Sequence, residues 1–300
     1  MKIFSKFKKL KKSIINLYNI DQKIAFHSKL NTLQNNAFIN NTPIVTDKKH
    51  LREDIIVSLT TFSKRIHQTH LVIESIAYQT VKPNRIILWL DEKEFNNENI
   101  PILLKKQKKR GLEIKYYENI KSYKKIIPTL EMSLSENIIT IDDDIIYPFY
   151  MIERFIAEHK KNPNTVLCNR AHEITKKNNK IESYKNWNLN IESNISSNLV
   201  FPTGIGGIFY PANCFDSEVL NKKQFEKLAP FADDIWLKAM TLRTNHEAQL
   251  IQQLGYFDNE FFLLESNQDI GLFHNNYYKN KNDVQFQNVF EHYNLIKKLQ

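Results

Sequence analysis

Short apolar runs alternate with amphipathic segments along most of this 300-residue chain. Four runs have strand length and are rich in β-branched or aromatic residues: 55–59, 85–90, 112–117 and 137–141. Periodic apolar positions predict helices over residues 66–77, 101–110 and 149–159. We therefore predict an α/β fold with a mixed, mostly parallel sheet flanked by helices. In such a sheet, ligands bind beyond the carboxyl ends of the strands.

The N-terminal segment has a helical pattern of its own. Apolar residues recur at steps of four and three, at Ile3, Phe7, Leu10, Ile14 and Leu17. Lysines fill six of the first twelve positions, so residues 1–18 read as a basic amphipathic helix. Such a helix either lies on an anionic membrane surface or packs on the body with its lysines in solvent. The composition of residues 19–50 predicts a linker or loose helical neck. Residues 51–300 would then form the main domain.

The distribution of charge excludes a nucleic-acid binder. The net charge is +9, but residues 1–12 hold six lysines and no acid, so the other 288 residues carry only +3. A nucleic-acid binder carries its positive charge on the folded surface that meets phosphate. Hydrophobic residues make up 42% of the chain, which is typical of a globular protein.

The cysteines and the absence of long apolar runs indicate in which compartment of the cell the protein is expected. Cys168 and Cys214 form no disulfide framework, which fits a reducing environment. No stretch has the length of a membrane span or the uninterrupted apolar core of a secretory signal. We therefore expect a cytoplasmic protein, held at the inner face of the membrane if the basic helix binds lipid.

Three consecutive acids end the fourth apolar run. Asp142, Asp143 and Asp144 repel one another, and a cation is the simplest compensation. Oxygen ligands on a tight turn suit Mg²⁺ or Mn²⁺, which keep open positions for phosphate oxygens. The alternative is a solvated acidic turn, but apolar residues on both sides of the triplet favour the metal site.

Two later segments also stand out. Three of the six glycines fall together at Gly204, Gly206 and Gly207, where they form either a plain turn or a loop that faces a ligand. Asp233 and Asp234 precede an apolar helical run, so we expect one of them to cap that helix. Two acids are more than a cap requires.

The sequence from Ile139 to Pro148 resembles the DxD segment of glycosyltransferases with the GT-A fold, in particular family-2-like bacterial enzymes that build surface polysaccharide or lipopolysaccharide. Residues 57–61, 78–80 and 83–91 also resemble that family, and the likeness spans about residues 54–286. The resemblance implies a metal-dependent glycosyltransferase that uses a nucleotide-sugar, a UDP-sugar being the expected donor. The acceptor would be a glycan or a lipid-linked glycan.

The resemblance also implies roles for individual residues. Asp142 would lie on the ribose side, and Asp144 would bind the metal directly, with Asp142 and the late His274 as further ligands. The nucleotide and donor sugar would contact the following residues: Thr60, Asp91, Lys124, Asp142, Asp143, Gly206 and Gly207. Asp234 would be the base that takes the proton of the acceptor hydroxyl, supported by Asp233, with inversion at the anomeric carbon. Apart from the resemblance, Arg170 and His172 follow the strand-like run 166–168, and we expect them to face the acceptor.

Two other functions remain open from the sequence. A Mg²⁺-dependent sugar nucleotidyltransferase also pairs an α/β sheet with acids, but no Gly-rich, Lys-containing phosphate loop follows the first predicted strand. A non-catalytic membrane adaptor would explain the basic helix and would leave both acidic clusters unexplained.

Overall fold

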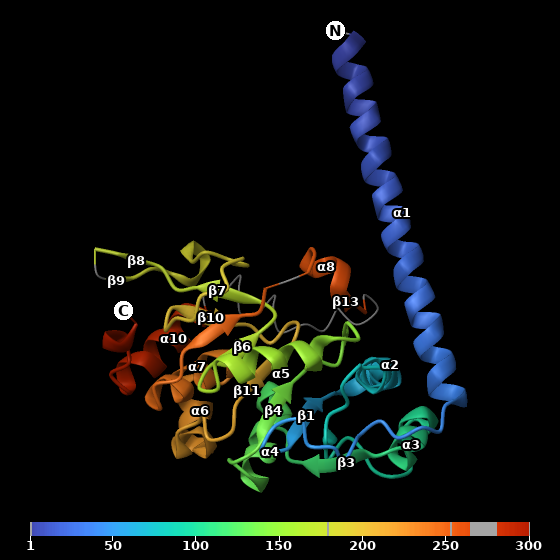
Figure 1. Ribbon diagram of the computed structural model, residues 1–300. Helices are drawn as coiled ribbons and strands as arrows, with labels where there is room; N and C mark the ends of the chain where they lie inside the picture. Colours follow the sequence, from blue (N-terminus) through green and yellow to red (C-terminus); the bar gives the residue numbers. More distant parts are fainter. Residues whose placement is uncertain (1, 179, 253, 265–280, 300) are drawn as a thin grey trace.

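A seven-stranded sheet forms the centre of the body in this computed structural model, which describes residues 2–178, 180–252, 254–264 and 281–299 (Figure 1). The strands lie in the order β12-β6-β11-β4-β1-β2-β3. Their bounds are β1 Ile55–Thr60, β2 Arg85–Asp91, β3 Leu112–Tyr117, β4 Asn137–Thr140, β6 Val166–Cys168, β11 Ile208–Tyr210 and β12 Ala248–Leu250. Strand β11 pairs antiparallel with β4 and β6, and the other neighbours pair in parallel.

Three two-stranded pairs of the described residues lie outside the central sheet. They are β7 Ala171–Glu173 with β10 Val200–Pro202, β5 Ile145–Ile146 with β13 Phe262–Leu263, and β8 Lys176–Lys177 with β9 Lys180–Ile181. All three are antiparallel. The first two pairs follow segments that leave the central sheet, and they bring residues 142–146 and 170–173 beside later parts of the chain.

Helices cover both faces of the sheet, because its buried strands carry apolar side chains on both sides. Neighbouring residues in β4 show this alternation: Ile138 belongs to one core cluster and Ile139 to the other. The helices of the body are α2 Ile66–Ala77, α3 Ile102–Lys109, α4 Ile127–Met132, α5 Met151–Lys161, α6 Lys222–Leu228, α7 Asp233–Arg243, α8 Phe257–Glu260 and α10 Lys281–His292. Short 3₁₀ turns are η1 Ser63–Arg65, η2 Lys121–Lys125, η3 Tyr184–Asn186, η4 Ser217–Leu220 and η6 Ile296–Lys298.

The predicted fold class is confirmed. All four predicted strands are present, with ends within one residue of the apolar runs, and the three predicted helices are α2, α3 and α5. The sheet is mixed and mostly parallel, as expected. Within the described ranges, no helix combines the length and the apolar character needed to cross a membrane.

The N-terminal helix is longer than its basic pattern. Helix α1 runs from Lys2 to Ile39, so it continues through most of the segment predicted to be a linker or loose neck. Its later part packs on the body through a second apolar series, which includes Phe26, Leu30, Leu33 and Ala37. This series maintains a continuous helix where the sequence predicts a linker or a loose helical neck. The first part of α1 extends away from the body (Figure 1).

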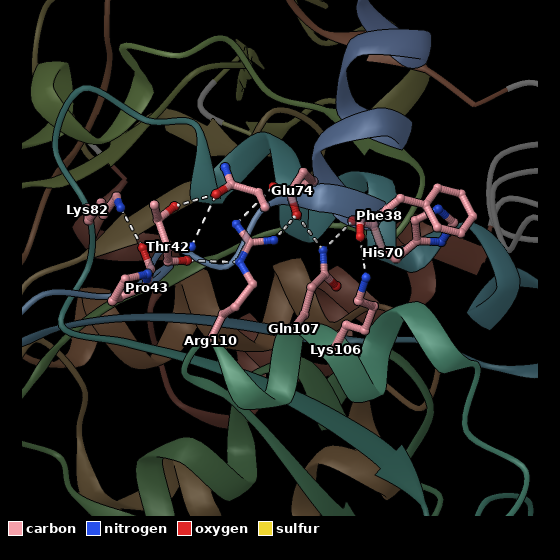
Figure 2. Close-up of polar contacts among 10 residues, drawn as sticks. Phe38, Thr42, Pro43, His70, Glu74, Lys82, Lys106, Gln107 and Arg110 are labelled. Carbon is pink, nitrogen blue, oxygen red and sulfur yellow. Dashed lines mark hydrogen bonds and ion pairs between the residues drawn. The ribbon is translucent and has the colours of Figure 1, made fainter.

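Buried polar contacts attach the base of α1 and the following turn to α2 and α3 (Figure 2). The Arg110 guanidinium donates two hydrogen bonds to the Glu74 carboxylate, at 2.8 and 3.0 Å. Its Nε also donates to the carbonyl of Thr42, at 2.9 Å. Gln107 donates to the same Glu74 carboxylate at 2.9 Å, and Lys106 donates to the carbonyl of Phe38. We call this set, from Phe38 to Arg110, the α1 anchor.

Candidate active site

A cavity of about 920 Å³ opens at the carboxyl ends of β1 and β4, where the strand order predicts a ligand site. Its volume lies in the range of sites for small molecules and cofactors. Four stretches supply most of its acidic and basic groups: Thr60–Arg65, Lys121–Lys125, Asp142–Asp144 and Asp233–Asp234. Segments 170–172 and 201–205 complete another wall.

Asp143, the middle acid of the triplet, is held by the protein itself. It is 5% exposed, and its carboxylate accepts hydrogen bonds from Thr61 Oγ1 at 2.6 Å and from Arg65 Nη1 at 2.8 Å. Burial raises the pKa of Asp143, whereas Arg65 and Thr61 lower it. These contacts fix the turn after β4 and leave the two flanking acids to face the cavity.

Asp142 and Asp144 remain more accessible than Asp143. Lys125 Nζ lies 3.3 Å from Asp142 Oδ1, and Arg65 Nη1 lies 3.0 Å from Asp144 Oδ2. Burial and the neighbouring charge of Asp142 raise the pKa of Asp144 to about 6. A carboxyl with this pKa gains from a cation that favours its charged form.

The two flanking acids fit a divalent cation of the Mg²⁺ type. Such an ion needs only one or two protein carboxylates when phosphate oxygens and water supply the remaining ligands. Among the described residues, no group of three or more His, Cys, Asp or Glu side chains is arranged to hold a metal. His274, predicted as a further ligand, lies outside the described residues.

Lys125 connects the two acidic clusters. Its ammonium lies 3.3 Å from Asp142 Oδ1 and 3.1 Å from Asp233 Oδ2, and the residue is 7% exposed. Burial by itself would lower the pKa of Lys125, but Asp142, Asp233 and Asp234 raise it well above its ordinary value. The family resemblance pointed to the adjacent Lys124 and missed Lys125, which holds both clusters together.

Asp234 lines the cavity, and its two carboxylate oxygens differ in their hydrogen bonds. Its Oδ2 accepts a hydrogen bond from the backbone N–H of Gly204 at 3.2 Å. Its Oδ1 is shielded from solvent and has no hydrogen-bond partner among the described residues. Burial and the charge of Asp233 raise the pKa of Asp234 to about 7, against the opposing effect of Lys125. These features suit a group that accepts a proton near neutral pH.

The predicted cap is wrong. Helix α7 begins at Asp233, its N-cap residue is Ala232, and no side chain caps it. Both acids therefore occupy the first turn, where the helix dipole stabilises negative charge without a capping bond. Their side chains point to the cavity and to Lys125 instead.

The glycine cluster divides into two parts. Gly204 lines the cavity, and a Cβ there would lie 2.9 Å from Lys125 Nζ and 3.5 Å from Asp142 Oδ2. Gly206 and Gly207 both have φ near +90° and do not line the cavity. A Cβ on Gly206 would meet the ring of Phe257 at 2.7 Å. The predicted contact residues Gly206 and Gly207 thus shape the turn, while Gly204 borders the site.

The other predicted nucleotide contacts lie at the ends of β1 and β2 and in η2. Thr60 and Lys124 line the cavity. Asp91 is 5% exposed and does not line it; its Oδ1 accepts a hydrogen bond from the N–H of Lys93 at 2.9 Å. The acid that lines the cavity here is Glu94, which the sequence analysis did not select.

Arg170 directly precedes β7, and His172 lies within it. Both line the cavity. Arg170 Nη1 donates to Thr203 Oγ1 at 3.4 Å. His172 Nδ1 accepts a hydrogen bond from the backbone N–H of Asn190 at 3.0 Å.

No known protein family matches this chain, and no curated protein matches it. Among solved structures, it is similar to a crystal structure of S. aureus TarS 1–349, with 14% identity, a TM-score of 0.45, and coverage of 68% of this chain and 59% of that chain. The crystal structure of S. aureus TarS 1–349 in complex with UDP gives 13% identity, a TM-score of 0.46 and the same coverage. This chain thus spans less than two thirds of the TarS 1–349 structures.

Proposed function

We propose that this chain is a glycosyltransferase that moves a sugar from a nucleotide-sugar, a UDP-sugar in the first instance, to a hydroxyl of a glycan acceptor. One observation carries the proposal: a single cavity contains both the flanking acids of the 142–144 turn and Asp234, whose Oδ1 has no hydrogen-bond partner in the described residues. The flanking acids suit a diphosphate with its cation, and Asp234 suits a general base.

The chemistry follows from these two groups. Asp234 accepts the proton of the acceptor hydroxyl as that oxygen attacks the anomeric carbon of the donor sugar. The bond from the anomeric carbon to the diphosphate oxygen breaks, the electron pair leaves with the nucleoside diphosphate, and attack from the opposite face inverts the anomeric centre. Asp142 and Asp144 would hold Mn²⁺ or Mg²⁺, which neutralises the charge of the departing diphosphate. Thr60, Lys124 and Glu94 border the space for the nucleotide.

Replacing Asp144 with asparagine tests the donor side. We expect Mn²⁺-dependent turnover of a panel of nucleotide-sugars to fall about 100-fold or more, because the variant loses a charged ligand and retains the side-chain volume. The matched control is Asp47→Asn, an exposed acid in the neck. The product distinguishes the alternative enzyme: a glycosyltransferase releases nucleoside diphosphate, and a nucleotidyltransferase releases pyrophosphate. Unchanged turnover in Asp144→Asn would refute the metal site.

The pH dependence of kcat tests the base. Asp234 acts only when deprotonated, and its pKa is raised to about 7. We therefore expect kcat to fall as pH drops below about 7 and to level off above it. The charged groups around Asp234 include Asp233, Lys125, Asp142 and, farther away, Arg170, and the cation would reduce the effect of Asp142. A kcat that is constant from pH 5 to pH 8 would exclude Asp234 as the base.

The basic first part of α1 is proposed to bind an anionic membrane surface, which would place the enzyme at the inner face of the membrane beside a lipid-linked acceptor. A lysine near such a surface contributes roughly 1 kcal/mol. We expect the full chain to sediment with vesicles of phosphatidylcholine and phosphatidylglycerol and not with phosphatidylcholine alone. Changing the six lysines of residues 2–12 to glutamine should abolish this binding and preserve turnover of soluble acceptors. Equal binding to both vesicles would refute the electrostatic contact, and loss of all function without residues 2–18 would favour a membrane adaptor.

A further inference from the structure

The wall of the cavity formed by segments 170–172 and 201–205 differs in charge from the rest of the site. Its described residues include Arg170, His172, Tyr184, Asn190 and Thr203, and none of them is an acid. By contrast, five aspartates line the cavity at the 142–144 turn and the start of α7. The cavity is therefore acidic where the cation and the base are proposed, and rich in hydrogen-bond donors on this wall.

Arg170 is the cationic group of this wall. Its backbone is fixed, because its carbonyl accepts a hydrogen bond from the N–H of Thr203 at 3.1 Å. Its guanidinium makes the long contact to Thr203 Oγ1 at 3.4 Å, and no carboxylate of the described residues lies within ion-pair distance of it. Burial lowers the pKa of Arg170, and Tyr184, Asp234 and Asp258 oppose this effect without forming an ion pair with it. A partly desolvated cation without an adjacent anion is costly, and a bound anion offsets that cost.

His172 adds a neutral donor beside Arg170. Burial and the charge of Arg170 lower the pKa of His172 to about 4, so the imidazole is neutral at physiological pH. Because Nδ1 accepts the hydrogen bond from Asn190 N–H, the ring proton lies on Nε2. His172 Nε2 is thus a donor, and the ring is held edge-to-face against Tyr184, with centroids 5.7 Å apart.

We propose that Arg170 and His172 bind a carboxylate or phosphate substituent of the acceptor, so that the enzyme selects an acidic glycan. The inference rests on the proposed glycosyl transfer. A guanidinium forms two parallel hydrogen bonds to either anion, which gives geometric selectivity in addition to charge. The aromatic ring of Tyr184 on the same wall offers apolar surface to the adjoining sugar ring.

Binding of simple sugars to the full chain tests this wall without requiring turnover. Glucose, glucuronate and glucose 6-phosphate are compared by ligand-observed NMR in the presence of a chelator, so that phosphate cannot bind through a cation at the 142–144 turn. We expect at least one charged sugar to bind about tenfold more tightly than glucose, equivalent to about 1.4 kcal/mol. The two charged probes distinguish carboxylate from phosphate.

Variants assign the preference to this wall. Arg170→Gln should abolish it, Arg170→Lys should retain a part, and His172→Gln should reduce it. Lys109→Gln, a change to an exposed lysine of α3 outside the cavity, should leave it unchanged. Circular dichroism establishes that each variant is folded. Equal binding of glucose and both charged sugars, or a preference that survives Arg170→Gln, overturns the proposal. So does a preference that appears only between UDP-glucuronate and UDP-glucose, since it places the anion on the transferred sugar.

The two proposals fail in different ways. An Arg170-dependent preference without turnover of any nucleotide-sugar would retain the anion site and refute the glycosyl transfer. Turnover of a nucleotide-sugar without the preference for a charged sugar would retain the glycosyl transfer and refute the anion site.

Discussion

Replacing Asp234 with asparagine is expected to lower the kcat of sugar transfer about 1,000-fold and to leave the affinity for the nucleotide-sugar within about threefold of wild type. Asparagine has nearly the same shape and still accepts the hydrogen bond of Gly204 N–H at the position of Oδ2. It cannot take a proton from the acceptor. The effect should therefore appear in the chemical step, as measured by single-turnover kinetics, and not in donor binding measured by calorimetry.

Two controls make this result specific. Asp47→Asn removes an exposed carboxylate far along the chain and should leave kcat unchanged. Asp233→Asn removes the neighbour that pairs with Lys125, so its effect should be smaller than that of Asp234→Asn. If Asp234→Asn retains kcat, or if both variants lose activity equally, the assignment of the base to Asp234 is wrong.

Replacing Lys125 with methionine is expected to cost about 3–5 kcal/mol of the free energy of unfolding, because it leaves buried carboxylates without their cation. For a protein of this size, that loss corresponds to a Tm lower by roughly 10 °C. Lys125 also lowers the pKa of Asp234. We therefore expect the rising limb of the kcat profile to move to higher pH in this variant. Calorimetry and the pH profile measure the two effects separately.

Lys109→Met is the matched control for this experiment, because Lys109 is exposed at the end of α3. It should change neither the Tm nor the pH profile. A Lys125→Met variant with wild-type stability would mean that Lys125 does not compensate the acids around it. A lower Tm with an unshifted profile would mean that its charge does not reach Asp234.

The sequence predicted the sheet well because its strands are buried on both faces and therefore read as continuous apolar runs. It also predicted which strand end carries the acids, since Asp142–Asp144 follow β4 directly. The sequence did not predict which residues pair with these acids. Arg65 lies 78 residues from Asp143 in the chain, and no local pattern connects them. Similarly, the choice between Lys124 and Lys125 depends on which way a 3₁₀ turn directs each side chain, which composition does not specify.

The glycines and the neck also show that local sequence patterns do not predict tertiary contacts. Spacing identified a glycine-rich turn, but only the fold separates Gly204, which borders the acids, from Gly206, which packs against Phe257. The neck was predicted to be loose because polar residues dominate it. Its sparse apolar positions nevertheless recur at helical intervals and pack on the body, so tertiary contacts determine its structure.

The α1 anchor fixes the direction of the protruding helix, and this has a geometric consequence (Figure 2). An α-helix turns about 100° and rises about 1.5 Å per residue, so Lys2 lies roughly 36 Å along the helix axis from Phe26. Deleting two residues between them would rotate the basic end by about 200° relative to the cavity, and deleting seven would shorten the helix by about 10 Å with only about 20° of rotation. The number of residues in α1 therefore determines both the height of the cavity above any surface that the basic end contacts and the direction in which the cavity faces.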